Sequence, residues 1–96
     1  MAEPIVTAAA EADYLEALIW YGKRSQRAAE GFETEFETAL AEIAAAPTRF
    51  AHCDPRHRRF LMRRYPYQVV YRLEGDHVVI IAVAHAKRKP QYWKQR

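Results

Sequence analysis

The spacing of the apolar residues changes twice along the chain. Residues 5–8 form a short apolar run, which predicts a brief first strand. From residue 11 the apolar positions follow the helical period, and the face that they share contains Leu15, Leu18, Ile19 and Gly22. The same segment opens with acids that suit the N-terminus of a helix: Glu11, Asp13 and Glu16. The pattern therefore predicts a strand followed by a helix.

A second helix has the clearest periodicity in the sequence. Ser25, in the connector before it, is a reasonable N-cap. Pro47 ends the helix, because the proline ring removes a backbone donor and forces the preceding residue out of the helical region. The two helices are thus predicted to form a hairpin. The apolar stripe of the second helix contains Phe32, Phe36, Ala39, Leu40 and Ile43.

After a polar loop at residues 48–57, the apolar period becomes two, as in β-strands. Phe60 and Met62 alternate with other residues, and a second alternating run follows at residues 67–73. A turn sequence separates this run from residues 77–85, which are apolar on both faces, as in a central strand. The helical hairpin would cover one face of this three-stranded antiparallel meander. By alternation, the other face would display Arg59, Arg63, Gln68 and Arg72.

Composition restricts the class of protein. The chain has 96 residues, of which 50% are hydrophobic, and this predicts a single α+β domain over residues 1–96. No secretory signal opens the sequence, and the longest apolar run is shorter than the roughly 20 residues that a transmembrane helix needs. Cys53 is the single cysteine, so no internal disulfide can form. We therefore expect a cytoplasmic protein without a membrane-spanning segment.

The charge is distributed unevenly along the chain. Residues 1–55 carry 4 Lys and Arg against 10 Asp and Glu, whereas residues 56–96 carry 11 against 2, a local net charge of +9. Such a basic half predicts a polyanion, or a machine that handles one, as the partner. The closing segment interleaves cations with aromatic rings, a combination that suits phosphate contact and base stacking. The candidate contact residues are Arg59, Arg63, Arg72, Lys87, Arg88, Lys89 and Lys94.

Several of these side chains have two interpretations. His85 is the best candidate for proton transfer, since an unperturbed imidazole titrates near ~6.5, but a histidine at a strand end also caps turns. Arg63 and Arg72 are either phosphate ligands or solvated residues of a sheet face. Tyr92 either donates a proton or stacks on a base. Trp93 is expected to fold back over the sheet and fill the core.

The sequence assigns no metal and no cofactor. His52, Cys53, Asp54 and His57 carry metal-capable side chains, but they lack a recognised zinc spacing. The default interpretation of Cys53 is a loop thiol and not a nucleophile. No glycine-rich phosphate loop is present, which argues against nucleotide hydrolysis. A small-molecule substrate is therefore not expected.

Three blocks of residues together form a pattern that covers almost the whole chain. They are Asp13 to Ala17 with Trp20 and Tyr21; Ala29, Phe32, Glu35, Ile43 and Pro47; and Arg63 to Tyr67 with Tyr71, followed by Ile81, Val83, His85, Arg88, Pro90, Tyr92 and Trp93. This pattern resembles the RelE/ParE superfamily of bacterial toxins, the toxic halves of type II toxin–antitoxin modules. The resemblance implies a β-α-α-β-β-β fold and a cognate antitoxin that silences the protein.

Members of this superfamily differ in their target, and the resemblance implies two candidates for this chain. Some members cut messenger RNA on the ribosome, and in these an arginine follows the tyrosine that opens the penultimate strand. Here Gln68 follows Tyr67, which favours the other class, the non-catalytic poisons of DNA gyrase. If the chain is instead a ribosome-dependent mRNA endoribonuclease, the candidate catalytic residues are His85, Arg63, Arg88 and Tyr92, the last aligned only after a shift of two residues. A third alternative is a degenerate member that only binds its antitoxin or nucleic acid.

The antitoxin should be complementary to the basic half of the chain. It is expected to present acids on an amphipathic helix or on an added strand. We expect it to cover the basic sheet face and the apolar surface on the side of Phe32 and Phe36.

Overall fold

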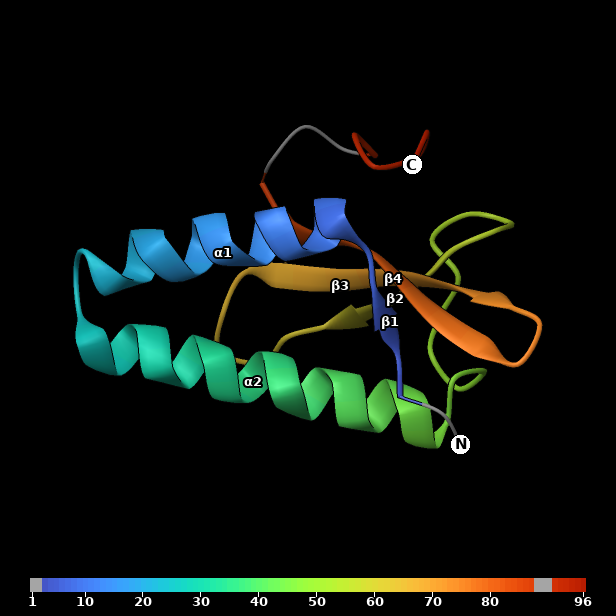
Figure 1. Cartoon of the computed structure of the whole chain (residues 1–96), viewed down its shortest axis with the longest axis horizontal. Helices are drawn as coiled ribbons and strands as arrows, with labels where there is room; N and C mark the ends of the chain where they lie inside the picture. Colours follow the sequence, from blue (N-terminus) through green and yellow to red (C-terminus); the bar gives the residue numbers. More distant parts are fainter. Residues whose placement is uncertain (1–2, 88–90) are drawn as a thin grey trace.

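The computed structural model describes residues 3–87 and 91–96. Its strands form one sheet in the order β1-β4-β3-β2, with β1 parallel to β4 and the other pairs antiparallel. The two helices run side by side along one face of this sheet (Figure 1). The predicted α+β class and β-α-α-β-β-β order are thus confirmed. The elements are β1 (Ile5–Val6), α1 (Ala8–Gly22), α2 (Gln26–Ala45), β2 (Arg58–Leu61), β3 (Tyr67–Glu74) and β4 (His77–His85).

Helix α2 begins and ends where its sequence predicts. The Ser25 hydroxyl accepts a hydrogen bond from the backbone N–H of Ala28 (3.1 Å), which satisfies a donor that the first turn leaves unpaired. At the other end, Ala46 has left the helical region (φ −150°, ψ 69°) ahead of Pro47. Leu40 is half-buried, and the other residues of the predicted stripe are buried: Phe32, Phe36, Ala39 and Ile43. The predicted inner face of α2 is confirmed.

The predicted inner face of α1 is wrong. Leu15 and Ile19 are 45% and 57% exposed. The helix is rotated because an aromatic ring occupies its contact with α2: the centroid of the Tyr14 ring lies 5.7 Å from that of Phe32 and 4.4 Å from that of Phe36. The residues that α1 buries or half-buries are Ala10, Tyr14, Ala17, Leu18 and Tyr21. The exposed aliphatic residues of α1 therefore face solvent.

Strand β4 is the central strand that its two apolar faces predict. It lies between β1 and β3, and its residues 78–84 are all buried. A register shift against β3 leaves Ile81 without a partner in the ladder, so that Ile81 and Ala82 both face away from the helices. Trp93 packs against this second face and is 2% exposed, which confirms that it folds back into the core. The sheet is therefore covered by the helices on one face and by the chain terminus on the other.

The turn between β2 and β3 is fixed to α2 at a glycine. The Tyr65 hydroxyl donates a hydrogen bond to the backbone carbonyl of Ala28 (2.7 Å). A Cβ atom at Gly31 would overlap this hydroxyl. The absence of a side chain at Gly31 is therefore what lets Tyr65 reach the helix backbone.

We predict that Gly31→Ala lowers the free energy of unfolding by about 1–3 kcal/mol, because overlap outweighs the ~1 kcal/mol by which alanine favours a helix. Urea unfolding measures this change. Gly22→Ala is the matched control, since its Cβ would meet nothing closer than the Cβ of Ala29 at 3.9 Å. Adding Tyr65→Phe to Gly31→Ala should recover stability, because the clashing oxygen is removed. Equal stability of the two single glycine variants would contradict this account.

Candidate functional site

His85 ends β4 beside Tyr67, its register partner in β3. The two rings meet edge to face with their centroids 4.9 Å apart, and Nδ1 of His85 accepts a hydrogen bond from the backbone N–H of Lys87 (3.0 Å). A pocket opens beside this pair, and its other lining residues are Asp13, Glu16, Ala17, Trp20, Tyr21 and Pro66. In the described parts of the chain, no lysine or arginine lines this pocket. The described lining of this pocket is thus aromatic and acidic.

The predicted arginines do not converge on His85. Arg72 lies in β3 opposite a residue six positions before His85 in β4, which separates the two by roughly 20 Å along the strand. Its guanidinium contacts Glu74. Arg63 instead extends from the end of β2 toward α2, where it forms an ion pair with Glu42 (3.9 Å). Among the described residues, His85 therefore has neither arginine beside it.

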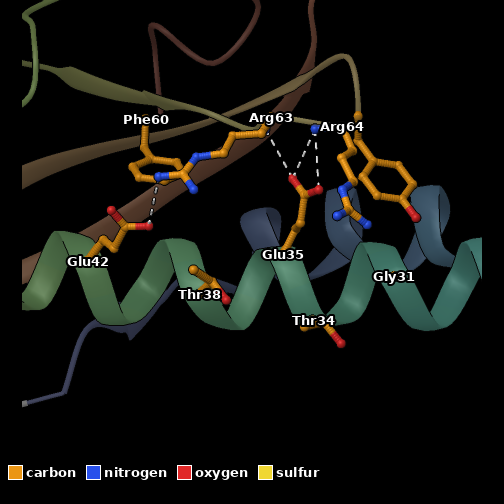
Figure 2. A pocket seen from close by; sticks show the side chains of 9 residues that line it. Gly31, Thr34, Glu35, Thr38, Glu42, Phe60, Arg63 and Arg64 are labelled. Carbon is orange, nitrogen blue, oxygen red and sulfur yellow. Dashed lines mark hydrogen bonds and ion pairs between the residues drawn. The ribbon is translucent and has the colours of Figure 1, made fainter.

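The prediction that Arg63 shares the open sheet face with Arg72 is wrong. Strand pairing ends at Leu61, and the turn beyond it is drawn toward α2. The Glu35 carboxylate accepts hydrogen bonds from the backbone N–H groups of Arg63 (3.1 Å) and Arg64 (3.2 Å), as Figure 2 shows. Alternation therefore stops at the strand end, and both guanidinium groups project from a turn that the helix holds in place (Figure 2).

Of the other predicted contact residues, Arg59 lies close to Arg63. These two arginines line a groove at the outer edge of β2, together with Arg49. The side chains of Arg49 and Arg63 are 66% and 81% exposed, and both lie against the single carboxylate of Glu42 at 3.7 and 3.9 Å. The groove therefore keeps an excess of positive charge. Lys87 and Lys94 are exposed, and Arg88 and Lys89 lie outside the described residues.

Residues 91–96 are held by Asp13, whose role the sequence pattern does not reveal. Its Oδ2 atom accepts hydrogen bonds from the backbone N–H of Val83 (3.1 Å), the Tyr92 hydroxyl (3.1 Å) and the Arg96 guanidinium (2.7 Å). The hydrogen bond with Asp13 raises the pKa of Arg96 above its ordinary value. Tyr92 is therefore part of the attachment of the chain terminus. The sequence identifies Asp13 only as an acid of the first helical turns, because its partners are at least 70 residues away.

A buried histidine lies under Trp93. The ring of His57 meets that of Trp93 edge to face at 5.0 Å, and its Nδ1 donates to the Asp54 carboxylate (2.9 Å). Burial alone would raise the pKa of Asp54, but hydrogen bonds from the His57 ring and from the backbone N–H groups of Arg56 and His57 lower it below its ordinary value. Burial also raises the pKa of the Cys53 thiol, which disfavours the reactive thiolate. The loop thus supports the chain terminus.

We predict that Asp54→Asn lowers the free energy of unfolding by about 1–3 kcal/mol at pH 7. The lowered pKa means that Asp54 contributes stability above its unfolded value of about 3.9 and loses it as the pH falls through the folded value. The difference between the wild type and the variant should therefore shrink as the pH falls below about 5. Urea unfolding over this range measures it, with Asp76→Asn in the exposed β3–β4 turn as control. A difference that is constant with pH would contradict the assignment.

The comparisons with known proteins agree with this fold. In the described residues, neither helix is long and apolar enough to cross a membrane. No curated protein matches the chain. Nine chains of solved structures do match. One of them, described as "Chromosomal ParDE TA system from P. aeruginosa", superimposes with a TM-score of 0.78 over 91% of this chain and 98% of its own length, at 16% identity. At that identity the likeness shows the fold alone.

The family comparison extends over most of the sequence. The profile described as "ParE toxin of type II toxin-antitoxin system, parDE" matches residues 5–90. These residues include both helices and all four strands. The chain therefore belongs to the ParE toxin family of type II toxin–antitoxin systems.

Proposed function

We propose that this toxin inhibits growth by binding DNA gyrase on DNA and stalling it, and not by cutting RNA. The observation that supports this proposal is the separation of His85 from Arg63 and Arg72. Cleavage of RNA by its own 2′-hydroxyl needs a base, an acid and cations around a single phosphate. The described lining of the pocket beside His85 contains Asp13 and Glu16 and no lysine or arginine that would bind such a phosphate.

The exposed cations suit a binding mode in which the side chains need not converge on a single phosphate group. Arginine side chains contact phosphates and carboxylates through two parallel hydrogen bonds, and such contacts can be spread over a surface. We assign Arg59, Arg63, Lys87 and Lys94 to the contact with the gyrase–DNA complex. The same positive charge attracts an acidic antitoxin, which would neutralise the toxin by covering these residues. Phe32 and Phe36 are themselves buried in the core, so an antitoxin on their side of the molecule would contact the surface around them.

Purified gyrase and supercoiled plasmid test the proposal. The toxin is expected to trap cleaved DNA that becomes linear after the gyrase is digested with protease, and the cognate antitoxin should abolish this product. Arg59→Ala/Arg63→Ala should reduce it at least tenfold, whereas Arg27→Ala, an exposed arginine of α2, and His85→Ala should leave it nearly unchanged. Intact plasmid together with ribosome-dependent mRNA cuts that His85→Ala abolishes would instead establish the endoribonuclease.

A further inference from the structure

Helix α1 has a second apolar row on its solvent side. Leu15 and Ile19 lie one turn apart and are about half exposed, and Ala12 and Gly22 continue the row at its two ends. The successive spacings of three, four and three residues are those of side chains that meet another helix. In the described parts of the chain, Leu15 and Ile19 take no part in the core that α1 forms with the sheet and with α2, and the row borders α2 at its Gly22 end, near Ala29. This row, which we call the α1 seam, is therefore free to meet a partner.

Neither the backbone conformation nor a close contact in the described part of a single copy requires glycine at position 22. Gly75 and Gln91 are the described residues with positive φ, so the backbone at Gly22 is one that any residue adopts. A Cβ atom there would lie 3.9 Å from the Cβ of Ala29, an ordinary contact. Glycine within a helix costs about 1 kcal/mol relative to alanine. A glycine at a helix surface allows the backbone of another helix to approach closely.

The order of small and large residues in the α1 seam is the same in both directions along the helix. Its small residues, Ala12 and Gly22, lie at the two ends, and its large residues, Leu15 and Ile19, lie between them, all symmetrically about position 17. Two antiparallel copies related by a two-fold axis would place Leu15 of one copy against Ile19 of the other. Ala12 would then lie against Gly22 of the second copy. A self-complementary row of this kind is what a two-fold interface requires.

The charges along α1 favour the same arrangement. Exposed acids lie toward its N-terminal end, at Glu11 and Glu16, and exposed cations lie at and beyond its C-terminal end, at Lys23 and Arg24. Antiparallel helices bring the acidic end of each copy beside the basic end of the other, whereas parallel helices would set like charges together. Charge and shape thus specify one orientation.

We propose that the α1 seam is a homodimer interface in which two copies of this chain pack their α1 helices antiparallel. This inference goes beyond gyrase binding and does not depend on it. An interface made by one helix from each copy is small, so we expect the dimer to dissociate on dilution.

Cysteine cross-linking tests the orientation. In a Cys53→Ala background, a mixture of Ala12→Cys and Gly22→Cys proteins should form a disulfide-linked dimer under mild oxidation. Neither variant alone should do so, because identical positions lie about 15 Å apart along the helices and a disulfide needs Cα atoms within about 7 Å. Cross-linking of either variant alone as strongly as the mixture would overturn the proposal.

Sedimentation of the purified chain over a range of concentrations tests the association itself. Ile19→Arg should weaken dimerisation at least tenfold. Leu73→Arg, which changes an exposed leucine of β3, should leave it unchanged. Circular dichroism verifies that both variants are folded. A chain that stays monomeric at the highest concentration would overturn the proposal. The proposal would also be overturned if the chain were monomeric and Ile19→Arg abolished antitoxin binding. The α1 seam would then be the binding surface for the antitoxin.

Discussion

Trp93→Ala is expected to lower the free energy of unfolding by about 3–5 kcal/mol, the range for a large aromatic residue removed from a core. Trp93 is 2% exposed and packs against the face of the sheet away from the helices. Its ring also contacts that of His57, whose Nε2 atom is already buried without a hydrogen-bond partner among the described residues. Truncation would therefore open a cavity beside a buried polar group. Urea unfolding measures the loss.

The second tryptophan of the chain is the matched control. Trp20 lies on α1, is 49% exposed, and stacks with the Arg24 guanidinium 3.6 Å above its ring centroid. Trp20→Ala should cost less than about 1 kcal/mol when measured on the dilute protein, as is usual for a surface substitution. If both variants lost the same stability, Trp93 would not anchor the second face of the sheet.

Asp13→Ala is expected to lower the free energy of unfolding by about 2–4 kcal/mol. The Asp13 side chain is 9% exposed, and its removal leaves the backbone N–H of Val83 in a buried strand without its acceptor. The Arg96 guanidinium loses its ion pair in the same step and keeps its hydrogen bond to the backbone carbonyl of Ile81. A buried donor left unsatisfied costs about 1–3 kcal/mol, and more when it is charged.

The same substitution should release the chain terminus. Because Asp13 also accepts from the Tyr92 hydroxyl, trypsin is expected to cleave after Lys94 several-fold faster in Asp13→Ala than in the wild type. Glu11→Ala, which removes an exposed acid from the first turn of the same helix, should change neither stability nor cleavage by a comparable amount. Unaltered cleavage in Asp13→Ala would show that the packing of Trp93 and the hydrogen bond from Arg96 to the Ile81 carbonyl hold residues 91–96 without Asp13.

The elements that are specified by a local pattern of apolar residues could be predicted from the sequence. The stripe of α2 and the apolar faces of β4 are local patterns, and a cap such as Ser25 acts within three residues. The face of α1 could not, because aliphatic residues outnumber tyrosines in its pattern while the tyrosine rings decide the packing against α2. Ring contacts between helices depend on tertiary distances that periodicity does not contain.

The candidate site was predictable only where strand pairing continues. Alternation places Arg59, Gln68 and Arg72 on the face away from the helices, and the register confirms this. It fails at Arg63, since Glu35 of α2 holds the turn by its backbone. It also misses Asp13, whose partners come from the far end of the chain. Both misses are carboxylates that bind backbone groups distant in sequence, for which a single sequence carries no local signal.

The most direct test of gyrase poisoning follows both targets in the same bacterial culture after the toxin is induced. Covalent gyrase–DNA complexes are quantified on the chromosome, and the 5′ ends of messenger RNA are mapped from the same cells. If the toxin poisons gyrase, gyrase-linked DNA breaks rise within minutes while the set of mRNA 5′ ends is unchanged. New mRNA 5′ ends within translated codons, without gyrase-linked breaks, would contradict gyrase poisoning.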